Sequence, residues 1–253
     1  MNLYLKKENV VLNTSPKCNS SSLKLMYLKH IGMYRKGTGF DLRIYDKDLY
    51  TCPHKDIHRS DITKIKFIRC PYERAVSCYY AAILWKIIDP RISFYGFLLK
   101  MSRLNLVKGH PLESQLEEPG GLHLKTQFAY DENRDIWDDI IQVENTKEGI
   151  FFINKKYEIK LKYENTRNDF DARNINRFPV YSLILQLYRK FKPGKIVGMC
   201  SSVKIPKHTP YIDYYNNTIR KLVEKIYERD IHNTDYTFKA FKQRYSRYIS
   251  PTD

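Results

Sequence analysis

Two segments of this 253-residue chain share one pattern, in which a short apolar run is followed by a polar loop and then by an amphipathic stretch. The first apolar run, Val10 to Leu12, is short, continuous and rich in β-branched residues, which favours a buried strand. Beyond the loop, side chains that can face a core recur at the spacing of one helix face. They are Leu23, Met26, Tyr27, His30 and Ile31. The pattern predicts a strand, a loop and a helix.

The second segment begins with the apolar run Ile65 to Ile68 and continues past Arg69 into a stretch that Pro71 can open. Proline suits the first turn of a helix because its missing N–H would have no partner there. The apolar face of this helix then comprises Ala75, Val76, Tyr79, Tyr80, Ile83, Leu84, Ile87 and Ile88. Two such units predict an α/β fold, in which helices flank a central parallel sheet and a P-loop-like site lies at its carboxyl edge.

The loop after the first strand carries groups that suit an anion. The first N–H groups of a helix lack partners within the helix and point outward, so they attract negative charge. The ammonium of Lys17 and the hydroxyls of Ser20, Ser21 and Ser22 would complete a phosphate cradle. The loop contains no glycine and is not a Walker loop. We therefore expect Asn19 to adopt the left-handed conformation that such a turn needs.

A second anion-binding group is expected at the next strand. Arg69 would lie at the carboxyl end of that strand, and Ser77 would lie two turns into the helix that follows. Open α/β sheets bind ligands at this edge. A guanidinium fork beside a hydroxyl suits a phosphate monoester.

Two short sequences together resemble the two signatures of sulfotransferases that use 3′-phosphoadenosine-5′-phosphosulfate (PAPS). They are P-K-C-N-S-S at 16–21 and R-C-P-Y-E-R-A-V-S-C-Y at 69–79. In that family the first signature holds the 5′-phosphosulfate. The second holds the 3′-phosphate through its first Arg and its Ser. The carbohydrate branch, which includes chondroitin and heparan 2-O-sulfotransferases, is the most similar. Cys70 departs from the family, which usually has an acidic residue or His there, and so does the glycine-free loop.

The resemblance implies a single sulfotransferase domain over 1–253 that moves the sulfuryl group of PAPS to an acceptor hydroxyl. It implies that Lys17 is catalytic at the leaving group and that His54, in a strand-end segment with His58, is the base. The implied PAPS-binding residues are Lys17, Cys18, Asn19, Ser20, Ser21, Ser22, Arg69, Ser77 and Lys207. The H-x-x-x-Q element at His123 and Gln127 would lie near the acceptor. His110, Glu113 and His123 are reserve candidates for the base.

The rest of the chain predicts further elements with less specific chemistry. A helix is expected over 93–104, an irregular acceptor-binding insertion over about 105–135 and a strand over 137–145 that ends at Glu144. A hairpin is expected over 151–161 and a helix over 179–191. The last expected elements are a loop over 204–215, which in the family closes over the nucleotide, and a closing helix with an apolar face over 219–227.

A formal net charge of +16 predicts a polyanionic partner. That partner could be a nucleic acid, an anionic membrane surface, an acidic glycan or a nucleotide that carries several phosphates. Two rival classes remain: a nucleotide kinase, which would share the strand–loop–helix cradle, and a nucleic-acid-binding module, which would account for the charge. A kinase of this fold would need a Walker loop and metal-holding carboxylates. A nucleic-acid-binding module would bind with a steep salt dependence, and no helix-turn-helix, zinc-finger or RNP-like pattern is present. We therefore expect no stable nucleic-acid partner.

The five cysteines are odd in number and form no C-x-x-C pair. They predict reduced thiols in a cytosol rather than a zinc site or a disulfide framework.

The polar start of the chain and the lack of a long apolar run predict neither a signal peptide nor a membrane anchor, and hence a cytoplasmic protein. No metal is needed in the reaction. The family branch favours a glycan acceptor, while a protein tyrosine, a lipid and a small alcohol remain open.

Overall fold

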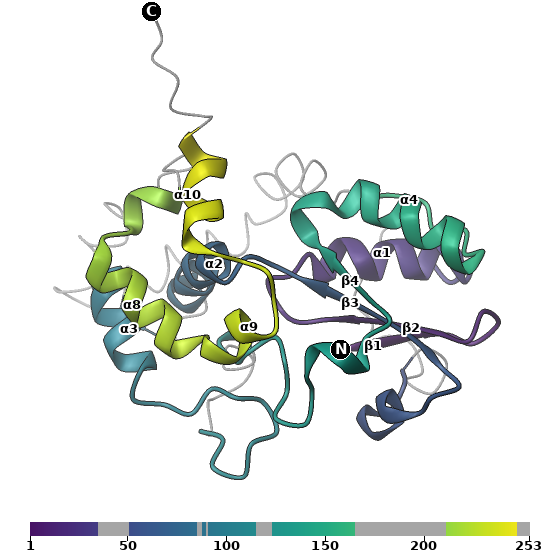
Figure 1. Cartoon of the computed structure of the whole chain (residues 1–253), viewed down its shortest axis with the longest axis horizontal. Coiled ribbons are helices and arrows are strands. Elements are labelled where there is room, and N and C mark those ends of the chain that lie inside the picture. The colour runs from purple at the N-terminus through teal and green to yellow at the C-terminus, as the bar shows by residue number, and fades with distance from the viewer. Residues whose placement is uncertain (35–50, 85–87, 90, 115–122, 165–210, 247–253) are drawn as a thin grey trace, which may run out of the picture.

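The computed structural model describes residues 1–34, 51–84, 88–89, 91–114, 123–164 and 211–246. Within these residues a four-stranded sheet with the order β1-β2-β3-β4 forms the centre of the molecule (Figure 1). The strands are β1 (Asn2–Leu5), β2 (Val10–Thr14), β3 (Thr63–Ile68) and β4 (Asp139–Gln142). The last three are parallel, and β1 pairs antiparallel with β2. The predicted α/β fold with a largely parallel sheet is confirmed, whereas β1 was not predicted.

The described α-helices confirm four predicted positions: after β2, after β3, within 93–104 and near the C-terminus. They are α1 (Ser20–His30), α2 (Pro71–Leu84), α3 (Phe94–Met101), α4 (Thr146–Tyr157), α8 (Asn217–Ile226), α9 (Glu228–His232) and α10 (Phe238–Ser246). Short 3₁₀ turns form η3 (His54–His58), η5 (Arg134–Ile136), η6 (Val143–Asn145) and η7 (Tyr211–Tyr214). Among the described helices, none is both long enough and apolar enough to cross a bilayer.

Alternation along the strands divides the core between the two faces of the sheet. Ile65 and Phe67 of β3 face α1 and α4, which cover the same side of the sheet (Figure 1). Ile68 faces the other side and joins a larger core built by α2, α3, α8 and α10. Aromatic side chains dominate that core, and Tyr72 stacks on Phe241 with ring centroids 5.4 Å apart. The sheet is therefore buried on both faces beside its carboxyl edge.

The expected hairpin over 151–161 is wrong, because α4 occupies Thr146–Tyr157. Its buried residues Thr146, Ile150 and Ile153 recur at helical spacing and pack with Ile141 of β4 and with α1. The apolar run that suggested a strand is thus one turn of an amphipathic helix.

The described residues of the expected insertion at 105–135 form no strand or α-helix, as predicted. The expected helix over 179–191 and the loop residues 204–210 lie outside the described residues. Of the five cysteines, Cys18, Cys52, Cys70 and Cys78 are free and buried in the described structure.

Candidate functional site

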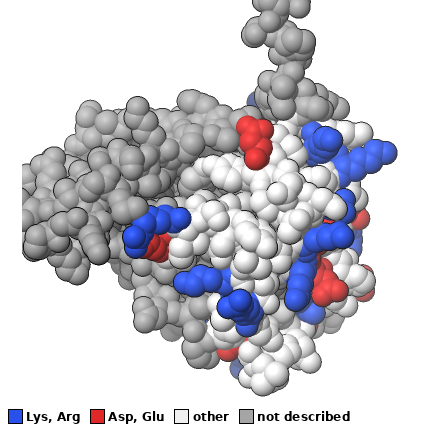
Figure 2. Space-filling view, turned by 90° about the vertical axis from the view of Figure 1, so that its left-hand side faces the viewer, with Lys and Arg blue, Asp and Glu red and all other residues white. Residues whose placement is uncertain are grey.

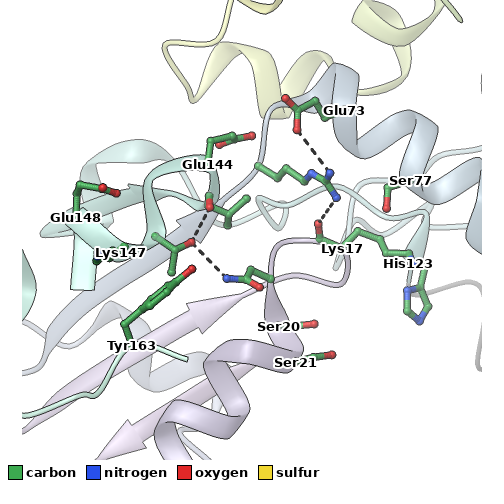
Figure 3. A pocket seen from close by; sticks show the side chains of 14 residues that line it. Lys17, Ser20, Ser21, Glu73, Ser77, His123, Glu144, Lys147, Glu148 and Tyr163 are labelled. Carbon is green, nitrogen blue, oxygen red and sulfur yellow. Dashed lines mark hydrogen bonds and ion pairs between the residues drawn. The ribbon is translucent and has the colours of Figure 1, made fainter. Parts of the chain in front are cut away.

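A cavity of about 580 Å³ lies where β2, β3 and β4 end. Residues that follow each of the three strands contribute to its wall, so it occupies the edge at which open α/β sheets bind ligands. It is lined by Lys17, Asn19, Ser20, Ser21, Arg69, Glu73, Ser77, His123, Val143, Glu144, Thr146, Lys147, Glu148 and Tyr163. The structure thus brings together the two predicted anion-binding segments in one cavity (Figure 3).

The loop between β2 and α1 has the backbone of an anion cradle. Lys17 and Asn19 both have positive φ, at 68° and 56°, so the left-handed conformation expected of Asn19 is confirmed. Turn conformations of this kind direct backbone N–H groups into a concavity that suits an anion. The loop is closed by hydrogen bonds from the Cys18 N–H to the Ser15 carbonyl (3.1 Å) and from Thr14 Oγ1 to the Cys18 carbonyl (2.8 Å).

Arg69 joins the second segment to this loop. Its Nη1 donates to the Lys17 carbonyl at 3.2 Å, and its Nη2 lies 3.5 Å from the Glu73 carboxylate. Both contacts are drawn in Figure 3. Glu73 is shared, because Nη1 of Arg244 lies 2.9 Å from its other oxygen. With only 7% of its surface exposed, Arg69 is a buried cation that one shared carboxylate does not fully neutralise.

Arg74 holds the loops around the cavity in place. It is fully buried, and its Nε donates to the Pro16 carbonyl at 3.3 Å. Its Nη2 donates to the carbonyls of His123 and Lys125. Asp230, also fully buried, lies 3.7 Å from Nη1 and supplies the opposite charge. Arg74 therefore fixes the cradle and the segment that carries His123 relative to α2, a role that the sequence analysis did not assign to it.

Gln127 lies beneath the cavity and does not line it. Its side chain is 2% exposed. The amide oxygen accepts a hydrogen bond from the backbone N–H of Arg69, and the amide nitrogen donates one to the backbone carbonyl of Arg69. The thiol of Cys18 donates to the same amide oxygen at 2.8 Å. The structure thus places Gln127, expected at the acceptor, behind both anion-binding segments, where it positions them.

His123 lines the cavity, and its imidazole is held in the neutral form. Partial burial, with the nearby charges of Lys17 and Arg74, lowers its pKa from 6.5 to about 4. Burial also lowers the pKa of Lys17, and the charges of Arg69 and Arg74 add to the effect. Several cations thus crowd one end of the cavity, and an anion bound there would stabilise their charged forms.

The structure does not bring His54 to the cavity. η3, which carries it, is the blue coil on the side of the sheet away from α1 and α4 in Figure 1. There the Nε2 of His54 lies 2.9 Å from Asp131, and the Nε2 of His58 lies 3.0 Å from the other oxygen of that carboxylate. The separation arises because Ile57, between the two histidines, is buried in the core on the α2 side.

The remaining predicted residues divide between wall and core. Cys18 and Ser22 are fully buried and do not line the cavity, and burial raises the pKa of the Cys18 thiol to about 11. Lys207 lies outside the described residues. The sequence analysis assigned no ligand-binding role to Thr146, Lys147, Glu148 and Tyr163. For Thr146, Lys147 and Glu148 the one usable signal was their position shortly after the third parallel strand, whereas Tyr163 follows α4.

Comparison with known proteins gives no family assignment, since no protein-family model, no curated protein and no solved structure matches the chain significantly. The case for a function therefore depends on the residues and geometry of the cavity.

Proposed function

We propose that the chain is a sulfotransferase that transfers the sulfuryl group of PAPS to an acceptor hydroxyl, with a glycan as the favoured acceptor. The observation that carries the proposal is the convergence of the two motifs that resemble the family signatures. Lys17, Ser20 and Ser21 from the first motif line the same cavity as Arg69 and Ser77 from the second. A donor with a phosphosulfate at one end and a phosphate monoester at the other requires two such anion sites side by side.

In this proposal the cradle binds the 5′-phosphosulfate and Arg69 with Ser77 binds the 3′-phosphate. Sulfuryl transfer resembles phosphoryl transfer in spreading charge over peripheral oxygens during an in-line displacement. The ammonium of Lys17 stabilises the negative charge that develops on the departing 5′-phosphate as the S–O bond breaks. Positioned positive charge in a partly dehydrated cavity is the largest contribution that such a site can make to the rate.

His123 is the base that this geometry favours, in place of His54. It lines the cavity, whereas His54 pairs with Asp131 elsewhere. Because its pKa is lowered to about 4, its imidazole is neutral near pH 7 and can accept the proton of the attacking hydroxyl. The bound phosphosulfate would raise this pKa through its negative charge, toward the range in which a base works best.

A magnesium-dependent nucleotide kinase is the second candidate, since the carboxylates of Glu144 and Glu148 also line the cavity. Glu144 is already engaged, because it accepts from the backbone N–H of Cys70 at 2.9 Å and from the hydroxyl of Tyr236. Glu148 is then the principal carboxylate for a metal ion, in a cavity whose loop is not a Walker loop. This arrangement favours the sulfotransferase.

A nucleic-acid-binding module would account for the net charge through a continuous basic surface. On the face shown in Figure 2, Lys and Arg are spread around a broad area of other residues and are interrupted by Asp and Glu. This distribution gives no support to a nucleic-acid interface on that face.

The proposal is tested by incubating the purified chain with PAPS and a panel of desulfated glycans, without magnesium, and measuring the adenosine 3′,5′-bisphosphate formed. We expect release that depends on the glycan. Consumption of ATP in the presence of magnesium, without any turnover of PAPS, would instead support the kinase.

A further inference from the structure

We propose that His54, His58 and Asp131 form a binding site for a divalent transition metal of the Zn²⁺ class, separate from the cavity at the carboxyl edge of the sheet. One nitrogen of each imidazole and one carboxylate oxygen lie within 4.8 Å of one another. Two imidazoles and one carboxylate are a donor set that binds Zn²⁺ while leaving a coordination position open. The sequence analysis considered zinc only for the cysteines, and none of these ligands is a cysteine.

Each imidazole nitrogen faces one oxygen of the same carboxylate. The Nε2 of His54 lies 2.9 Å from Oδ1 of Asp131, and the Nε2 of His58 lies 3.0 Å from Oδ2. The two rings stand nearly perpendicular, at 83°, with centroids 6.2 Å apart. In a tetrahedral zinc site, bonds of about 2.0–2.1 Å place neighbouring ligand atoms roughly 3.3 Å apart. A metal would therefore require each imidazole nitrogen to move a few tenths of an ångström away from the carboxylate oxygen it faces. The two nitrogens, which lie within 4.8 Å of each other, would also have to take up that spacing.

The segment that carries Asp131 is held rigidly. Arg229 donates through Nε to the Ala129 carbonyl at 2.8 Å and through Nη2 to the carbonyls of Tyr130 and Glu132. These bonds bracket Asp131 on both sides. The histidines are the first and last residues of η3, and Ile57 of the same turn is fully buried. A site on two anchored segments loses little conformational freedom when it binds a ligand.

A second carboxylate behind His54 is an independent sign of a metal site. Glu132 lies 3.8 Å from Nδ1 of His54, on the side of the ring away from Asp131. It is 2% exposed and is held by the buried ammonium of Lys66 at 2.5 Å. Metal-binding histidines usually direct their other ring nitrogen to a carboxylate, which fixes the tautomer and leaves the ligating nitrogen unprotonated. Glu132 lies on the correct side of the ring for this role, and an approach of several tenths of an ångström would bring it from 3.8 Å into hydrogen-bond range of Nδ1.

The donor set indicates the metal. Imidazole nitrogens favour Zn²⁺, Co²⁺ and Ni²⁺ over Mg²⁺ and Ca²⁺, which prefer oxygen ligands. With the side chains 38%, 40% and 48% exposed, water can fill the remaining position. The ion would join η3 to a segment more than seventy residues later in the chain, so binding should also stabilise the fold.

The test uses the full-length chain without an affinity tag, first stripped with a chelator and then freed of it. Zn²⁺ is titrated by calorimetry, and Co²⁺ is followed by its visible absorption, which reports a site with nitrogen ligands. We expect one equivalent to bind to the wild type. His54→Ala, His58→Ala and Asp131→Asn should each weaken binding by at least about tenfold, because each removes one of three ligands.

His30→Ala is the matched control, because His30 also pairs with a carboxylate, that of Glu8 at 2.9 Å, but belongs to no cluster with a second histidine among the residues that the structure describes. It should bind Zn²⁺ like the wild type. The three ligands are partly exposed, so the variants should fold. Circular dichroism checks this, because the metal-free variants should melt at the same temperature as the metal-free wild type. Wild-type Zn²⁺ affinity in a variant that lacks all three ligands would overturn the proposal, as would an absence of binding to the wild type.

Discussion

The amide side chain of Gln127 pairs with both backbone groups of Arg69. Its Oε1 accepts from the Arg69 N–H at 2.7 Å, and its Nε2 donates to the Arg69 carbonyl at 2.9 Å. The same Oε1 accepts from the thiol of Cys18. One buried side chain therefore holds the end of β3 against the loop after β2, and the distance between the two segments proposed to bind anions depends on it.

We expect Gln127→Met to lower the free energy of unfolding by about 2–4 kcal/mol, because it leaves a buried N–H and a buried carbonyl of Arg69 without partners. Equilibrium unfolding in urea measures the change. Lys239→Met, at an exposed position of α10, is the control and should change stability by less than about 0.5 kcal/mol. An equally small effect at Gln127 would show that its hydrogen bonds contribute little.

The parts of the site that sequence analysis located are those encoded locally. The apolar run at Val10, the loop and the helix that follows lie within about twenty residues, and the same is true around Arg69. Asn19 was singled out because it tolerates positive φ better than most residues, and it has that conformation. Local pattern and backbone preference were sufficient for these two segments of the cavity wall, but not for the part that follows β4.

Contacts between distant segments were not predictable in this way. Gln127 and Asp230 are 103 residues apart, yet Asp230 accepts from the Gln127 backbone N–H. The role of Arg74 depends on carbonyls from two other segments. His54 was expected at the site because it precedes β3, but the burial of Ile57 draws η3 to the opposite side of the sheet. The helix α4 was missed because its apolar run is also typical of a strand.

The role proposed for Lys17 predicts a split between rate and binding. Lys17→Ala should reduce turnover of PAPS by about 100- to 1,000-fold, because it removes the charge that stabilises the leaving group. Affinity for adenosine 3′,5′-bisphosphate should fall by less than about tenfold, since the other phosphate contacts remain. Turnover assays and calorimetry measure the two effects, with the exposed Lys100→Ala as the control. Equal losses in rate and affinity would contradict the assigned role.

His123 should make the stability of the unliganded protein depend on pH. Its pKa is about 4 when folded and about 6.5 when unfolded, so between these values only the unfolded chain takes up the proton. Stability should therefore fall as pH falls from about 6.5 to about 4. The contribution is about 1–2 kcal/mol, because the imidazole is partly open to the cavity and screened.

The measurement compares the urea midpoints of the wild type and His123→Gln across this range of pH. The difference between the two proteins should shift in favour of the variant as the solution is acidified, because the variant lacks the titrating group. A difference that stays constant over the same range would exclude the lowered pKa of His123.

Gly149 allows α4 to pack closely on β4. A Cβ at this position would lie 2.3 Å from Cγ2 of Ile141, a β-branched core side chain with little freedom to move. Gly149→Ala should therefore cost about 1–3 kcal/mol in spite of the better helix propensity of alanine. Gly96→Ala in α3 is the control, since its nearest contact would be 3.2 Å, and its effect on the thermal midpoint should be smaller. Equal midpoints in the two variants would contradict the close approach.

The most direct test of the central claim is calorimetric titration with adenosine 3′,5′-bisphosphate, AMP and ATP, each without and with magnesium. We expect the bisphosphate to bind without magnesium and AMP to bind at least about tenfold more weakly, because it lacks the phosphate assigned to Arg69. Ser77→Ala and Arg69→Ala should weaken the binding of the bisphosphate but not that of AMP. Arg91→Ala, at an exposed arginine, should weaken neither. Binding of ATP with magnesium, together with no binding of the bisphosphate, would contradict the sulfotransferase assignment.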